Sequence, residues 1–183
     1  DAFSLWFLAL LYDFTSEEKY LDTAVWRTDG GIFFAQLPRG GFPGHNFHIG
    51  YQSIIANGLA SLYDVLPEGH AFQDRLRRRL CMSLNFCTFM QSPSGDYHQG
   101  WEYDREFRLD EAGNPAGNSG AARSELIRAF YKAKNRLDVP DEIYDALCRS
   151  ILSRIGSLKT APEGERRGFA SLMDIGVLLK WAT

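Results

Sequence analysis

Two acidic residues near the middle of the chain carry the side chains that hydrolysis of a glycosidic bond requires. Glu102 and Asp104 alternate with Trp101 and Tyr103 in a segment with a residue period of two. In a strand, carboxylates at i and i+2 share one face, with about 6–7 Å between their stems. Inverting glycosidases hold their carboxyl groups roughly 6.5–9.5 Å apart, and retaining ones about 5 Å. Glu102 is therefore a candidate acid and Asp104 its candidate partner, while the aromatic rings could stack on a sugar or fill the core.

Proton transfer by histidine or tyrosine is a second possible chemistry. Neutral His and Tyr can act as acid or base if a pocket shifts their pKa values. A lyase that acts on a uronate needs such a base, together with an Asn, His or Arg that neutralises the sugar carboxylate. Side chains of these types occur at His45, Asn46, His48, Tyr51, His98, Tyr103 and Arg123.

Metal and nucleotide chemistry are less favoured. His45 and His48, at i and i+3, could chelate an ion, but no Cys or carboxylate stands beside them at ligand spacing. The sequence has no glycine-rich phosphate loop, no Gly-x-Ser-x-Gly elbow and no Cys–His constellation. We therefore expect no metal and no cofactor.

The bulk composition is that of one globular domain spanning residues 1–183. The chain is 45% hydrophobic, which supplies ample material for a core, and its net charge of −3 gives no electrostatic case for nucleic acid. The apolar segment from Ala2 to Tyr12 is too short to span a bilayer, so no membrane partner is expected. Three cysteines do not make a disulfide framework, and we expect all of them to be buried thiols. The compartment stays open.

A turn motif, Gln-x-Pro-x-Gly-(Gly/Asp)-aromatic, occurs twice, at residues 36–42 and 91–97. Each copy closes a predicted helical stretch. Gly40 or Gly95 can take the left-handed conformation that ends a helix. The glutamine amide can bind free backbone groups near that end, and the aromatic ring can fill the gap between successive helical hairpins. We therefore expect structural roles for Gln36, Gln91, Phe42 and Tyr97.

Apolar residues at helical spacing predict an all-α chain. The first helix is apolar nearly all round, so burial on several sides is expected. Thr15-x-x-Glu18 predicts a capping box for the second helix, which the Gly30-Gly31 pair should interrupt. Asn118 or Ser119 should cap the fifth. The predicted helices span 2–13, 16–36, 48–65, 70–91, 119–137, 140–159 and 170–182, with a short strand at 101–109 and a turn at 110–115.

The helices pair in series, giving about three and a half hairpins. The odd-numbered helices are the more apolar and should form an inner layer, and the even-numbered ones carry a charged outer face. Each hairpin in such a stack is stabilised by its neighbours. Closed rings of this kind hold about five to seven hairpins, so we expect a partial ring: a fragment, a chain completed by a partner or by self-association, or an open stack.

Residues 10–24, LLYDFTSEEKYLDTA, resemble the LY-x-x-T-x-x-x-x-YL-x-x-A segment of the six-hairpin glycosidases. Their (α/α) toroids repeat this segment before a Gln-x-x-x-Gly-x-aromatic turn. The resemblance implies a toroid-type domain. It also implies an active site at the mouth ringed by the outer-to-inner loops, here 37–50, 92–118 and 160–169. Polysaccharide lyases, sugar epimerases and terpenoid cyclases are built on similar rings.

The sequence therefore predicts a carbohydrate-active enzyme domain whose partner is a glycan or oligosaccharide. A glycosidase-like hydrolase is favoured over a uronate-directed lyase, and both over a non-catalytic binding module or a cyclase-like toroid. The predicted catalytic residues are Glu102, Asp104, His98 and Tyr103, and the predicted substrate contacts are His45, His48, Tyr51, Trp101 and Arg123.

Overall fold

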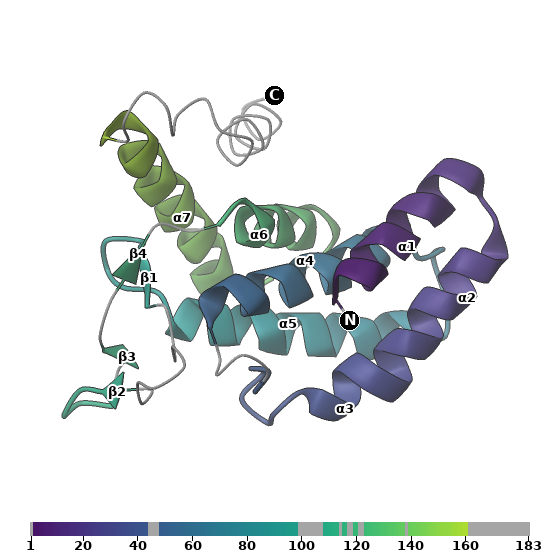
Figure 1. Cartoon of the computed structure of the whole chain (residues 1–183), viewed down its shortest axis with the longest axis horizontal. Helices are drawn as coiled ribbons and strands as arrows, with labels where there is room; N and C mark the ends of the chain where they lie inside the picture. The colour runs from purple at the N-terminus through teal and green to yellow at the C-terminus, as the bar shows by residue number, and fades with distance from the viewer. Residues whose placement is uncertain are drawn as a thin grey trace.

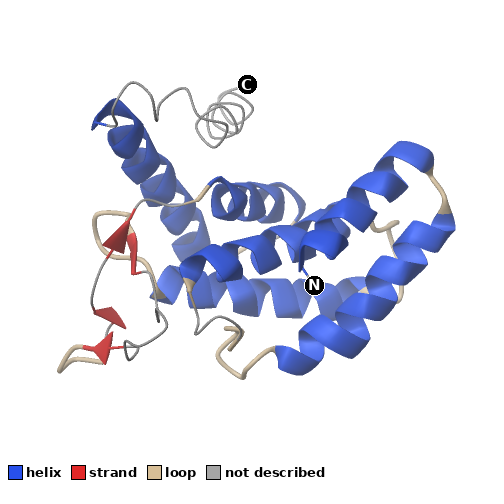
Figure 2. Cartoon of the chain, in the orientation of Figure 1, coloured by secondary structure: helices blue, strands red, loops and turns tan. Residues whose placement is uncertain are grey.

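The computed structural model is predominantly helical, as the sequence predicts (Figure 1, Figure 2). It describes residues 2–43, 48–98, 108–113, 115–116, 119–120, 123–137 and 139–160. The predicted helix 170–182 lies outside these ranges. The helices are α1 (Ala2–Thr15), α2 (Glu18–Arg27), the π-helix η1 (Thr28–Ile32), α3 (Phe33–Ala35), α4 (Ile49–Val65), α5 (Gln73–Phe89), α6 (Ser124–Arg136) and α7 (Asp141–Thr160), and the two-residue strands are β1 (Tyr97–His98), β2 (Arg108–Leu109), β3 (Pro115–Ala116) and β4 (Ser119–Gly120).

Helix α4 is the centre of the molecule and packs between α1 and α6. Each of these three helices is also contacted by the long helix that follows it: α2 packs on α1, α5 on α4, and α7 on α6. Helices α5 and α7 touch as well. The first, third and fifth predicted helices are thus neighbours in one layer, with their partners beside them.

The core lies between α4 and its neighbours. The predicted stripe of α5 is buried from Leu76 through Leu84 to Cys87, and Phe130 of α6 is fully buried too. Burial in this apolar surrounding raises the pKa of the Cys87 thiol to about 12. The expectation of three buried thiols was wrong for Cys81 and Cys148, which are partly exposed.

The expectation that the first helix is buried on several sides was wrong. In α1 only Leu5 and Ala9 are buried, whereas Phe3, Phe7 and Phe14 are 55%, 61% and 89% exposed. Among the described elements, α1 packs chiefly on α2 and α4, and these contacts leave its phenylalanine side chains exposed. None of the described helices is long and apolar enough to cross a membrane.

The second predicted helix is continuous, because the Gly30-Gly31 pair widens it into a π-helix instead of interrupting it. A π-turn keeps the backbone hydrogen-bonded while adding a residue to the turn. The predicted capping box is absent: Glu17 is the N-cap residue and its side chain makes no capping bond. The Thr15 hydroxyl donates to the Leu11 carbonyl 2.7 Å away, inside α1, and accepts from the Glu17 N–H at 3.2 Å and not from that of Glu18.

The fifth predicted helix starts later than expected, at Ser124 in place of residue 119. The residues Ser119–Gly120 pair with Tyr97–His98 as antiparallel strands, which takes their backbone out of the helix. Ser119 is therefore not a helix cap, and Asn118 lies outside the described residues. The predicted turn after residue 109 is confirmed by the Ala112 amide, which donates to the Asp110 carboxylate at 2.9 Å.

The first glutamine turn joins the end of one outer helix to the middle of the next. The Gln36 amide donates to the carbonyls of Gly40 and Arg79, both at 3.0 Å. Gly40 has φ +92°, and a Cβ built on it would lie 1.9 Å from the Met82 carbonyl oxygen. Only glycine fits there, because both the backbone conformation and the space exclude a side chain.

The second glutamine turn makes the same contacts one hairpin later. The Gln91 amide donates to the Ala146 carbonyl of α7 at 3.0 Å and to the Gly95 carbonyl at 3.5 Å. Gly95 has φ +88°, and its Cβ would lie 2.3 Å from the Arg149 carbonyl oxygen. The structural role predicted for both turns is confirmed.

Candidate functional site

Five of the nine predicted site residues lie outside the part of the chain that the structure describes. These residues are Glu102, Asp104, Tyr103, Trp101 and His45. The carboxylate pair proposed for hydrolysis therefore stays a prediction. The other four predicted residues are His48, Tyr51, His98 and Arg123, and the structure places each of them.

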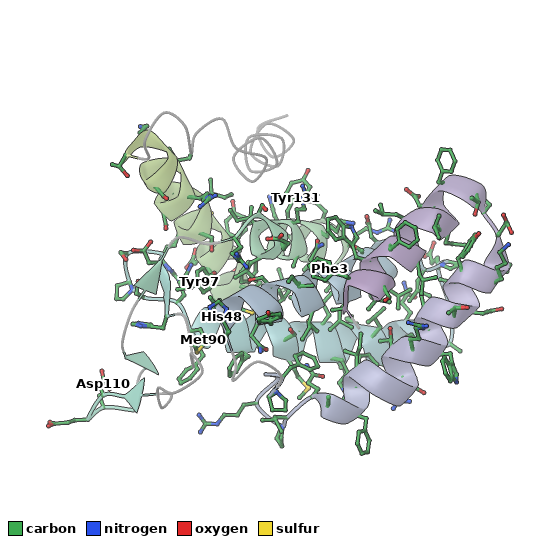
Figure 3. All side chains as sticks on the ribbon, in the orientation of Figure 1. Phe3, His48, Met90, Tyr97, Asp110 and Tyr131 are labelled. Carbon is green, nitrogen blue, oxygen red and sulfur yellow. The ribbon has the colours of Figure 1, made fainter. Side chains whose placement is uncertain are left out.

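His48 and Tyr51 lie at the N-terminal end of α4. Figure 3 labels His48 there. His48 is the N-cap residue, and its Nδ1 accepts a hydrogen bond from the Gly50 amide at 3.1 Å. The two rings meet edge to face, with centroids 6.0 Å apart. Tyr51 is 41% exposed, so a substrate could reach its ring.

Arg123 joins this cluster from the neighbouring helix. It is the N-cap residue of α6, and its side chain reaches the start of α4. A Cβ built on Gly50 would lie 2.6 Å from Arg123 Nη1 and 3.0 Å from His48 Nδ1. The glycine thus leaves the space in which the guanidinium sits beside the imidazole. The structure brings together three of the predicted residues from two helices.

The electrostatics of this cluster favour an anion. Partial positive charge gathers at the N-terminus of a helix, and here two helices, α4 and α6, begin beside the guanidinium. Among the described residues no carboxylate forms an ion pair with Arg123. A guanidinium in such a place binds a carboxylate through two parallel hydrogen bonds.

The hydrogen bond at His48 also fixes which ring nitrogen carries the proton and can donate a hydrogen bond to a ligand. Nδ1 accepts from a backbone N–H, so the proton of the neutral ring is on Nε2. While it caps α4, His48 can therefore donate a hydrogen bond to a bound oxygen but cannot take a proton at Nε2. Tyr51 is left as the proton-transfer group of the cluster.

His98 lies on β1, in the ribbon formed with β4. Its backbone N–H donates to the Met90 carbonyl at 2.9 Å. Its Nδ1 is buried and has no hydrogen-bond partner within the described ranges. Among the described residues, the contacts of His98 are with Met90 and β4 and not with the His48–Tyr51–Arg123 cluster.

Sequence reasoning missed two residues that position this cluster, Gly50 and Gln52. The Gln52 amide donates to the Phe42 carbonyl at 2.8 Å, and its oxygen accepts from the Phe42 N–H at 3.0 Å. This pair of bonds fixes the end of the first glutamine turn against the first turn of α4. Neither residue leaves a signal in the sequence, because the burial of Gln52 is set by elements that pack on α4 and not by the sequence of α4 itself.

No cluster of three His, Cys, Asp or Glu residues suited to a metal ion occurs within the described ranges. Comparison with known proteins found no similarity to report, because no family model, curated protein or solved structure matches the chain. The function must therefore be argued from the geometry of the site.

Proposed function

We propose that the chain is a carbohydrate-active enzyme domain that binds a carboxylated glycan at the His48–Tyr51–Arg123 cluster. The observation that carries the proposal is the Arg123 guanidinium seated over Gly50, beside His48, where α4 and α6 begin. A uronate carboxylate placed on Arg123 would bring the neighbouring sugar carbon to the accessible Tyr51. The resemblance of residues 10–24 to six-hairpin glycosidases supports the choice of a glycan.

The reaction that these side chains support best is elimination from a uronate. Arg123, assisted by the Nε2–H of His48, neutralises the carboxylate and so stabilises the carbanion that forms beside it. Tyr51, in its phenolate form, takes the proton from that carbon and becomes the neutral phenol. The bond from the next carbon to the glycosidic oxygen breaks, and the leaving oxygen receives the proton back. The products are a shortened chain and an unsaturated uronate.

An assay with polygalacturonate tests this proposal. The expected result is a rise in ultraviolet absorbance from the unsaturated product, with none from a neutral glucan. Tyr51→Phe should abolish turnover and keep binding, whereas Arg123→Gln should weaken binding by about 10- to 100-fold, the value of a charged hydrogen bond. Arg78→Gln, the same charge change on the exposed part of α5, is the matched control. Unchanged turnover in Tyr51→Phe and Arg123→Gln would remove the assignment.

Hydrolysis is the second candidate function, and the resemblance of residues 10–24 is the observation that favours it. It would use Glu102 as the acid and Asp104 as its partner. Release of reducing sugar without ultraviolet-absorbing product would support it. Glu102→Gln should then abolish turnover while leaving the melting temperature unchanged. Glycan binding without any turnover would instead indicate a binding module.

We also propose an (α/α) toroid-type arrangement, complete or partial, for the helical pairs. Two observations support it: α1, α4 and α6 are neighbours in one layer, and equivalent glutamine turns link successive outer helices. A low-resolution solution envelope of the native protein, combined with its mass, tests whether the ring is closed by further hairpins or by a second copy.

A further inference from the structure

A pocket separate from the His48–Tyr51–Arg123 cluster lies between α1, α4 and α6. Its volume is about 500 Å³, which suits a small organic molecule. Its walls come from the middle and the C-terminal parts of the three helices, whereas the cluster lies where α4 and α6 begin. Trp6 from α1, Asn57 from α4 and Arg128 from α6 line it.

Asn57 is the most informative residue of this pocket. Its side chain is only 1% exposed, and neither Oδ1 nor Nδ2 has a hydrogen-bond partner within the described ranges. A buried amide without partners destabilises a fold, and native structures keep few such groups. Asn57 lines the pocket, but both of its amide atoms are covered by protein atoms, so a ligand would meet them when the side chain turns toward the pocket and would then supply both a donor and an acceptor.

The contacts between α4 and α6 place Asn57 and Arg128 at the same height along the axes of these two neighbouring helices. Lys132 Nζ lies 3.2 Å from Ser61 Oγ, and Arg136 Nε lies 3.4 Å from Asp64 Oδ1. The two helices therefore run in the same direction and pair residues turn by turn. Asn57 precedes Ser61 by one helical turn, and Arg128 precedes Lys132 by one turn.

The charge around Asn57 and Arg128 is positive. The Arg128 guanidinium lies 5.5 Å from the centre of the Trp6 ring, and no carboxylate forms an ion pair with it among the described residues. Asp64 already faces Lys132 and Arg136. Asp13 also lines the pocket, but it lies seven residues beyond Trp6 along α1, about 10 Å away at the helical rise.

We infer that the Trp6–Asn57–Arg128 pocket binds a small hydroxycarboxylic acid. The planar guanidinium of Arg128 takes the carboxylate, and the buried Asn57 amide takes the hydroxyl or a second oxygen. Such an acid could be a sugar acid or a simple hydroxy acid. The inference does not rest on the proposed function, because the residues involved belong to a different part of the helices.

The test is a titration followed by the side-chain amide resonances of the protein in NMR spectra. It is carried out on the Arg123→Gln variant, so that binding at the other cluster does not contribute. D-glucuronate and L-lactate are the probes, D-glucose is the neutral control, and inorganic phosphate is the non-planar anion. We expect at least one acid to shift the Asn57 resonance, with glucose and phosphate binding at least tenfold more weakly. Binding of glucuronate without binding of lactate would identify the ligand as a sugar acid. Binding of lactate with the same affinity as glucuronate would identify it as a simple hydroxy acid.

Three further variants decide the residue assignment. In the Arg123→Gln protein, the second substitution Arg128→Gln should weaken acid binding by about 10- to 100-fold, whereas Arg78→Gln as the second substitution should leave acid binding unchanged. Asn57→Leu should abolish binding and raise the melting temperature, because it removes an unpaired buried amide. If Asn57→Leu does not fold, the Arg128→Gln result stands alone. Equal binding of glucose or phosphate, no binding of either acid, or undiminished binding in Arg128→Gln would overturn the inference.

Discussion

The two glutamine turns use the same anchor but hold their aromatic residues differently. In both, a glutamine amide donates to the carbonyl of the turn glycine and to a carbonyl of the next outer helix. The side chain of Phe42 has no polar atom, so Gln52 fixes this residue through its backbone N–H and carbonyl. Tyr97 is fixed through its own hydroxyl, 2.7 Å from Ser150 Oγ. The glycine and glutamine are therefore the common element, and the aromatic support is specific to each hairpin.

The largest effect should follow from adding a methyl group to a turn glycine. Gly40→Ala places a Cβ against the Met82 carbonyl and forces a positive φ, so we expect a loss of about 3–5 kcal/mol of unfolding free energy, with slightly less for Gly95→Ala. Gly69→Ala is the matched control: its φ is +78°, but nothing lies within 4 Å of the new Cβ. Urea unfolding measures all three. Equal losses at Gly40 and Gly69 would show that close packing of the turn is unimportant.

The second-largest loss of stability should follow from removing Gln52, whose side chain binds the backbone of Phe42. Gln52→Leu leaves both the N–H and the carbonyl of Phe42 without their partner, and we expect a loss of about 2–3 kcal/mol. The variant should also weaken glycan binding, because Gln52 positions the start of α4 beside His48. A stability equal to that of the parent would contradict the role given to this glutamine.

The anchors themselves should differ in strength. The two N–H bonds of the Gln91 amide are shared among four oxygens, and its Oε1 accepts from Arg149 Nε at 3.0 Å. Gln36 Oε1 accepts from Arg79 Nη1 at the longer distance of 3.4 Å. We expect Gln91→Leu to cost about 2 kcal/mol and Gln36→Leu about 1 kcal/mol. Chemical denaturation of both variants checks the order. The reverse order would mean that the shorter bond from Arg149 to Gln91 contributes little.

The smallest effect concerns pH and separates the tyrosine turn from the phenylalanine turn. Burial raises the pKa of Tyr97 above its ordinary value of 10.0. Its contribution to stability is thus complete below about pH 10 and is lost as the pH rises beyond that value, because only the unfolded chain ionises there. Tyr97→Phe should cost about 1 kcal/mol at pH 8 and nearly nothing at pH 11.

Urea unfolding of parent and Tyr97→Phe at both pH values provides the measurement. Phe42→Leu in the first turn serves as the control, since its cost should not depend on pH between these values. A constant cost for Tyr97→Phe would indicate that the hydroxyl ionises as easily in the folded chain as in the unfolded one.

The sequence predicted most of the local structure, namely the helical segments and the two glutamine turns. Helical periodicity located the six described helical segments to within a few residues, and the repeated glutamine motif identified both turns. Two local predictions failed, the capping box at Thr15 and the interruption at Gly30-Gly31. Two other failures involve partners distant in sequence. Pairing with β1 shortened the fifth helix, and the described neighbours of α1, chiefly α2 and α4, leave its apolar side chains exposed. Neither effect leaves a signal within the segment concerned.

The candidate site was predictable in its residue types but not in its arrangement. His48 and Tyr51 share one helix start, so their proximity follows from spacing alone. Arg123 joins them only because α6 packs beside α4 with Gly50 at the contact. The polar residues inside α4, Gln52 and Asn57, look like exposed positions of an ordinary helix until its neighbours on each side are known.

The most direct test of the central claim is the binding of polygalacturonate to the parent protein, to Arg123→Gln and to Arg78→Gln, by calorimetry at one salt concentration. The guanidinium seated over Gly50 predicts that Arg123→Gln loses about 10- to 100-fold in affinity and that Arg78→Gln matches the parent. Equal weakening in both variants would indicate diffuse electrostatic attraction and would contradict a carboxylate site at the start of α4 and α6.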